Sequence, residues 1–122
     1  MLEIYDCFTF YNETVLLELR LAELYNVVDH FVIVESNQTF TNNPKPWNFD
    51  PANYPEYADK IILVRVEDMP GSDNPWHNEH HQRNAIMRGL GAAKDNDIVI
   101  VSDVDEIPRV EAVQALRASD QT

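Results

Sequence analysis

The amino-acid sequence predicts an α/β fold, in which a mostly parallel, Rossmann-like sheet carries helices on both of its faces. Strand-type and helix-type segments alternate along the chain, which is typical of βαβ units. The strand-type segments are continuous apolar runs, as in parallel strands that are buried on both sides. The 122 residues correspond in size to one domain, so we expect a single domain over residues 1–122.

The first half of the chain contains two predicted strands and one predicted helix. Residues 4–10 are apolar and aromatic, and residues 30–35 (HFVIVE) form a second apolar run. Between them, Asn12 is suited to cap a helix over residues 13–25. Helical periodicity places Leu17, Leu21 and Leu24 on the buried stripe of this helix and Glu18, Arg20 and Glu23 elsewhere.

Two further strands are predicted in the second half, at residues 61–66 (IILVRV) and 98–102. The connection that leads to the first of them, residues 36–59, contains four prolines and many asparagines. This connection is long for a segment without structure of its own. We therefore expect either a functional loop or short elements within it.

Two further helices complete the pattern. One begins at a proline and is expected to cover residues 75–93. Its predicted buried side carries Ile86, Leu90 and Ala93. Gly89 and Gly91 weaken this helix and predict close packing against the sheet. A short helix over residues 110–118 follows Pro108.

Charge and cysteine usage restrict the classes of function. The net charge of −12 argues against nucleic acid or an anionic membrane surface as the partner. No apolar run approaches the roughly 18 residues of a membrane span, and no signal peptide is visible. Cys7, the only cysteine, is expected to be a small core residue in a protein of a reducing, cytoplasmic compartment. The glycosylation sequons at Asn12 and Asn37 are therefore interpreted as chance matches.

The carboxyl ends of the predicted strands carry acids, and ligands of open α/β sheets bind beyond these ends. The sharpest case is Asp103-Val104-Asp105, directly after the apolar run IVIV. In an extended segment residues i and i+2 point to the same side, so both carboxylates would hold one Mg²⁺ or Mn²⁺ ion. Such an ion would neutralise a diphosphate leaving group. The alternative is a polar strand end whose acids cap the following helix.

Three other motifs each have two interpretations. His77 and His81 lie one helical turn apart, but without an HExxH pattern or a nearby cysteine an exposed polar turn is favoured over zinc binding. Arg83 shares a helix side with Met87 and Leu90, so it requires an anion, either a structural partner such as Asp103 or a substrate phosphate. Glu35 is either a ribose contact at a strand end or a plain solvated acid.

Several segments resemble glycosyltransferase family 17 in order along the chain: YDCFTFYNE, VVDHFVIVES, TFTNNPKPWNF, DKIILVRVEDMP, EHHQRNAIMRGL and DNDIVIVSDVDEIPR. This is the family of the β-1,4-mannosyl-glycoprotein β-1,4-N-acetylglucosaminyltransferases. The resemblance implies a GT-A fold, a UDP-sugar donor such as UDP-GlcNAc, and inverting transfer to a hydroxyl of a glycan acceptor. Its Asp-x-Asp element matches Asp103 and Asp105, which would bind Mn²⁺ or Mg²⁺.

The remaining site residues are predictions of lower specificity. The residues expected to bind the donor are Asn12, Glu13, Glu35, Arg83, Asn84 and Asp103. A general base must accept the proton of the acceptor hydroxyl, and Glu106 is the candidate.

GT-A enzymes build the acceptor site from residues after the Asp-x-Asp element. We therefore expect this chain to be C-terminally incomplete and to represent the donor-binding half. The alternative function is a non-catalytic nucleotide-sugar-binding remnant or subunit that lacks an acceptor site. Apolar surface exposed where the other half would pack would allow the chain to form a homo-oligomer.

Overall fold

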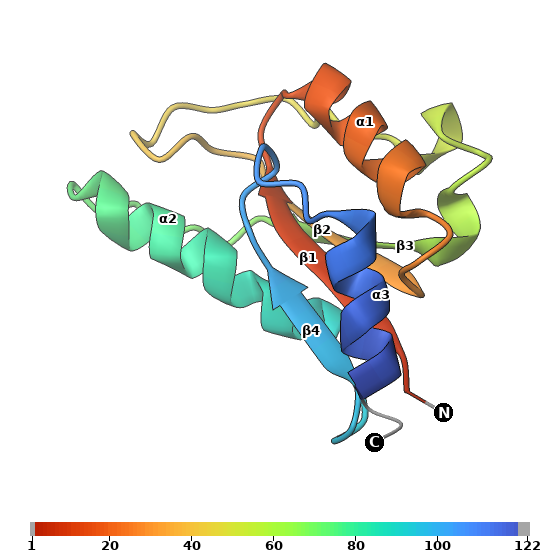
Figure 1. Ribbon diagram of the computed structural model, residues 1–122. Coiled ribbons are helices and arrows are strands. Elements are labelled where there is room, and N and C mark those ends of the chain that lie inside the picture. The colour runs from red at the N-terminus through yellow and green to blue at the C-terminus, as the bar shows by residue number, and fades with distance from the viewer. Residues whose placement is uncertain (1, 120–122) are drawn as a thin grey trace.

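Four strands form a parallel sheet in the computed structural model, which describes residues 2–119 (Figure 1). They are β1 (Ile4–Phe10), β2 (His30–Ser36), β3 (Ile61–Val66) and β4 (Ile98–Val101), in the spatial order β3-β2-β1-β4. All neighbouring strands pair in parallel. The predicted parallel sheet and the positions of its strands are thus confirmed.

Helices cover both faces of this sheet, as predicted (Figure 1). On one face, α1 (Thr14–Leu24) and α3 (Val110–Ser119) pack on apolar side chains of β1 and β2. This cluster includes Ile4, Phe8, Leu17, Leu21, Leu24, Ile33 and Val113. On the other face, α2 (Pro75–Asn84) continues into a 3₁₀ turn, Ala85–Gly89, that packs on the sheet. That cluster includes Tyr5, Cys7, Val32, Val34, Ala85 and Ile86.

The strand order creates a topological switch point between β1 and β4. From β1 the chain builds the sheet outward through β2 to β3, then returns to place β4 on the other side of β1. Connections that diverge from neighbouring strands leave a crevice at their carboxyl ends. β4 pairs only as far as Val101 opposite Cys7, so the chain after β4 leaves the sheet beside the last residues of β1.

Two predicted elements differ from the structure. The helix expected over residues 75–93 ends at Asn84, and its 3₁₀ continuation ends at Gly89. Met87, predicted on the inward side with Arg83, is exposed because the 3₁₀ turn changes the angular spacing of the side chains. The connection over residues 36–59 does contain short elements: the 3₁₀ turns Pro51–Asn53 and Ala58–Lys60.

Gly89 lies directly on the sheet. A Cβ at this position would stand 2.6 Å from Cγ1 of Val32 and 3.1 Å from Cγ2 of Val64. No atom lies within 4 Å of the corresponding Cβ position at Gly91. The prediction of close packing is therefore confirmed for Gly89 and wrong for Gly91.

Cys7 is a buried core residue, as predicted. Burial and the neighbouring Asp6 carboxylate raise the pKa of its thiol to about 12, so it is not a thiolate nucleophile at neutral pH. No helix within residues 2–119 is long and apolar enough to cross a membrane.

The contrast between the two glycines is testable by substitution. Gly89→Ala should lower the free energy of unfolding by about 1–3 kcal/mol, because Val32 of β2 and Val64 of β3 must move. Gly91→Ala is the matched control and should change it by at most about 1 kcal/mol, in the stabilising direction. Urea denaturation measures both. Equal effects of the two substitutions would contradict the close approach at Gly89.

Candidate functional site

A buried ion pair joins the sheet to the segment after β4. Asp6 lies in β1 and Arg20 in α1, and both side chains are fully buried. Nε and one terminal nitrogen of Arg20 donate to the two Asp6 oxygens at 2.8 and 2.6 Å. The same guanidinium donates to the Asp103 carbonyl oxygen at 2.7 Å and to Oγ of Ser102 at 2.6 Å. Arg20 therefore fixes the start of the Asp-x-Asp segment against β1.

Arg20 corrects the sequence interpretation, which placed it off the buried stripe of its helix. Its guanidinium carbon lies 4.3 Å from the centre of the Phe8 ring, inside the same packing layer. The charge is tolerated there because Asp6 neutralises it. A sequence signal existed: Leu17, Arg20, Leu21 and Leu24 follow helical i, i+3, i+4, i+7 spacing.

The segment from Asp103 to Glu106 forms a turn. The Glu106 N–H donates to the Asp103 carbonyl oxygen at 2.9 Å, and the Glu106 carboxylate accepts from the Asp103 N–H at 2.9 Å. Val104 is buried in the core between the two acids. The predicted extended geometry is therefore wrong, because the Val104 anchor and the Arg20 contact bend the chain. Both Asp103 and Asp105 nevertheless line the same cleft.

This cleft lies at the carboxyl ends of β1 and β2 and has a volume of about 630 Å³. Its size lies within the range of small-molecule sites. Polar and aromatic side chains from the segments after β1, β2 and β4 and from α2 line it. They include Tyr11, Glu13, Ser36, Gln38, Lys45, Glu79, Gln82, Asp103 and Asp105. The predicted crevice at the strand ends is thus present at the switch point.

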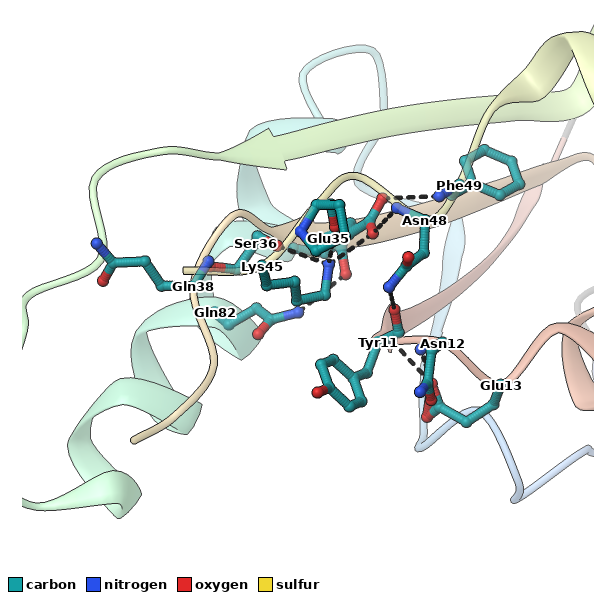
Figure 2. Close-up of polar contacts among 12 residues, drawn as sticks. Tyr11, Asn12, Glu13, Glu35, Ser36, Gln38, Lys45, Asn48, Phe49 and Gln82 are labelled. Atoms are coloured by element: carbon teal, nitrogen blue, oxygen red, sulfur yellow. Dashed lines mark hydrogen bonds and ion pairs between the residues drawn. The ribbon is translucent and has the colours of Figure 1, made fainter. Parts of the chain in front are cut away.

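The Tyr11–Glu13 segment forms one side of the cleft, and Figure 2 shows its contacts. The Glu13 carboxylate accepts from the N–H groups of Tyr11 and Asn12 at 2.8 and 2.7 Å. Asn48 donates its side-chain amide to the Tyr11 carbonyl oxygen at 2.7 Å. The predicted capping role of Asn12 is wrong, because Glu13 occupies the N-cap position and makes no side-chain cap bond. Glu13 lines the cleft, whereas Asn12 does not.

Glu35 is fully buried, and its carboxylate organises the loop after β2 (Figure 2). One oxygen accepts from Lys45 Nζ and from the Asn48 N–H, both at 2.6 Å. The other oxygen accepts from the Phe49 N–H at 3.1 Å. The interpretation as a solvated acid is therefore wrong. A ribose contact stays a prediction, with both oxygens already hydrogen bonded. Lys45, which was not among the predicted site residues, lines the cleft beside Tyr11.

Asn78 fixes the same loop from the opposite side. It is fully buried in α2 and donates its amide to the carbonyl oxygens of Phe40 and Ser72 at 2.7 and 2.9 Å. Phe40 lines the cleft, so α2 sets the position of this wall. No charge or motif in the sequence indicated this role for an asparagine within the run NEHHQRN.

Arg83 forms an ion pair with Asp103. Its terminal nitrogen lies 2.7 Å from Oδ1 of Asp103 and 3.7 Å from a carboxylate oxygen of Glu79. The sequence left two anions open as partners of Arg83, Asp103 or a substrate phosphate, and the structure shows the pair with Asp103. The adjacent Gln82 is buried, lines the cleft and donates to the Val34 carbonyl oxygen at 3.1 Å. Asn84 is exposed and does not line the cleft, so its predicted donor contact stays a prediction.

The two histidines considered for zinc have separate partners. His77 contacts Oγ of Ser72 at 3.2 Å, and His81 contacts Asp68 at 3.4 Å. Within residues 2–119 no three histidine, cysteine, aspartate or glutamate side chains are grouped to hold a metal. Mg²⁺ and Mn²⁺ require fewer protein ligands, because waters and substrate phosphates complete their coordination. Asp103 and Asp105 fit that requirement.

The sequence profile of glycosyltransferase family 17 matches residues 2–122. The chain belongs to glycosyltransferase family 17. It is 29% identical over 119 residues to the β-1,4-mannosyl-glycoprotein 4-β-N-acetylglucosaminyltransferases of Homo sapiens, Rattus norvegicus and Mus musculus. These matches cover 89% of the chain but 22% of each relative. This family 17 chain therefore spans about a fifth of the length of those relatives. No solved structure matches it significantly.

The buried ion pair yields a stability prediction. Arg20→Met leaves Asp6 buried without its partner, so the free energy of unfolding should fall by about 3–5 kcal/mol. Adding Asp6→Leu in the same chain removes the unpaired charge and should recover most of this loss. Urea denaturation of the single and double variants measures the difference.

Arg109→Met is the matched control, because Arg109 is exposed and lies just beyond the same turn. It should change the free energy of unfolding by at most about 0.5 kcal/mol. A loss in Arg20→Met no larger than in Arg109→Met would contradict the burial of Asp6 with Arg20 as its charge partner.

Proposed function

We propose that this chain forms the donor-binding part of a metal-dependent glycosyltransferase that transfers N-acetylglucosamine from UDP-GlcNAc to a glycan hydroxyl with inversion. One observation carries the proposal: both acids of the Asp-x-Asp element line a cleft at the switch point of a parallel sheet in a family 17 chain. The names of the relatives support N-acetylglucosamine as the sugar and a glycoprotein glycan as the acceptor class.

Asp103 and Asp105 would hold the cation. Both are carboxylates in the turn after β4, which suits the preference of Mn²⁺ and Mg²⁺ for oxygen ligands. When bound, the cation would neutralise charge on the diphosphate leaving group. Arg20 supports this role because it bonds the backbone carbonyl oxygen of Asp103 and leaves the Asp103 carboxylate for another partner.

The rest of the cleft suits a nucleoside and a sugar. Glu13 lines the cleft from the segment after β1 and bonds the N–H of Asn12, which lies outside the lining, and Glu35 organises the loop after β2 through Lys45. Tyr11 is half exposed beside Lys45, which gives the cleft an aromatic surface next to a cation. Arg83 lies beside Asp103, at the position where the phosphates would approach the cation.

In the proposed reaction, the oxygen of the acceptor hydroxyl attacks the anomeric carbon while the bond from that carbon to the diphosphate oxygen breaks. The hydroxyl proton passes to a general base, and the nucleoside diphosphate leaves. Glu106 remains the candidate base. Its carboxylate accepts from the Asp103 N–H and would have to reach the acceptor hydroxyl from the turn.

Nucleotide-sugar binding without transfer is the second candidate, because the matched region covers 22% of each relative and this cleft is proposed to bind the donor alone. Both candidates need the same donor site. Only the first predicts release of UDP when a glycan acceptor is added.

Calorimetric titration tests the donor site. UDP-GlcNAc and UDP should bind in the presence of Mn²⁺, and chelation of the metal should weaken binding. Asp105→Ala should weaken it at least about tenfold, or about 1.4 kcal/mol, because one cation ligand is lost. Asp95→Ala is the matched control, since this exposed acid precedes β4 at the other end of the sheet. Binding of UDP-GlcNAc and UDP that chelation leaves unchanged, or equal effects of Asp105→Ala and Asp95→Ala, would contradict the proposal.

A further inference from the structure

The Asp103 carboxylate already has a cationic partner in the free protein, the guanidinium of Arg83. Oδ1 of Asp103 lies 2.7 Å from the Arg83 guanidinium, so the predicted metal ligand carries an ion-pair partner. Both side chains are partly exposed, at 51% for Asp103 and 42% for Arg83. A cation that approached Asp103 would therefore meet a positive charge within hydrogen-bond distance of its ligand oxygen. The metal site and the Arg83 pair compete for one carboxylate.

Arg83 is able to leave Asp103 without disturbing the turn. Arg20 holds the carbonyl oxygen of Asp103 at 2.7 Å, and the Glu106 carboxylate holds its N–H at 2.9 Å. Both contacts are to the Asp103 backbone. Exchange of the side-chain partner consequently requires only side-chain motion.

A displaced Arg83 needs another anion. Glu79 lies one turn away on α2, 3.7 Å from the guanidinium, and lines the cleft. A diphosphate would provide the stronger acceptor, because a guanidinium binds phosphate oxygens through two parallel hydrogen bonds. The ligand that needs a divalent cation thus also offers the group that removes Arg83 from Asp103.

We propose that Arg83 and the divalent cation exchange places on Asp103: Arg83 occupies the carboxylate in the free protein and moves to the diphosphate when a nucleoside diphosphate binds. This inference rests on the proposed donor site. Cation and nucleoside diphosphate then strengthen each other's binding, and linkage makes this effect reciprocal.

Arg83→Gln separates this exchange from a merely structural role. Electron paramagnetic resonance measures free Mn²⁺, and calorimetry with chelator measures UDP binding without metal. In Arg83→Gln, Mn²⁺ should bind at least about fivefold more tightly than to the wild type when UDP is absent, whereas metal-free UDP binding should weaken by a similar factor. An increase in Mn²⁺ affinity together with a decrease in metal-free UDP affinity is the result that exchange predicts.

Arg88→Gln is the matched control. Arg88 pairs with Asp68 at 2.8 and 3.0 Å, away from the cleft, so its loss removes the same charge and also frees one carboxylate. Mn²⁺ affinity in Arg83→Gln no higher than in Arg88→Gln would overturn the exchange. Unchanged metal-free UDP binding in Arg83→Gln would also overturn it.

The wild type distinguishes this failure from failure of the donor site. If wild-type protein binds no Mn²⁺ even with UDP present, the metal-dependent donor site is wrong and the exchange falls with it. If wild-type protein binds Mn²⁺ with UDP and Asp103→Asn abolishes that binding, the donor site stands, and the comparison of Arg83→Gln with Arg88→Gln decides the exchange alone.

Discussion

The buried pair of Asp6 and Arg20 is the constraint on which the site depends. A fully buried ion pair costs desolvation energy that its own attraction barely offsets, so it is weak evidence for stability by itself. In this fold the pair instead fixes the position of the segment after β4. Arg20 has donors in a rigid planar fork, and it directs some of them to Asp6 and the others to Ser102 and Asp103. The sheet thereby sets the position of the turn that carries both predicted cation ligands.

A second buried carboxylate and cation, Glu35 and Lys45, organise the opposite wall. Glu35 accepts from Lys45 and from two backbone N–H groups of the loop after β2, and Lys45 also donates to the carbonyl oxygen of Ser36. Neither pair presents free charge to the cleft, because their polar groups are bonded within the fold. Asp103, which lines the cleft, and Arg83, which pairs with it, are left partly exposed, so their contact is the one proposed to change. Buried charge positions the walls of the cleft, and the partly exposed Asp103 is the carboxylate proposed to bind the cation.

The fold could be predicted from the sequence because its signals are local. Apolar runs and helical spacing lie within single segments, and they placed the four strands and the first helix correctly. The contacts of the site were harder to predict from the sequence, because they join residues that are far apart along the chain. Arg20 contacts Ser102 and Asp103, which follow it by 82 and 83 residues, and Asn78 contacts Phe40, which precedes it by 38 residues. Local pattern also misjudged the Asp-x-Asp geometry, since the bend depends on the burial of Val104 in a core built by other elements.

The acidity of the chain favours a cation as the companion of the proposed donor. Glu13, Glu79, Asp103 and Asp105 all line the cleft, while Lys45 is committed to Glu35 and Arg83 to Asp103. A diphosphate that entered alone would meet Glu13 and Asp105, which have no ion-pair partner among the described residues, and the net charge of −12 would add to the repulsion. In the proposed exchange, a divalent cation would reverse the local charge once the guanidinium has left Asp103. The acids that would repel the nucleotide would then make its binding depend on metal, and Arg83 is the residue through which that dependence would act.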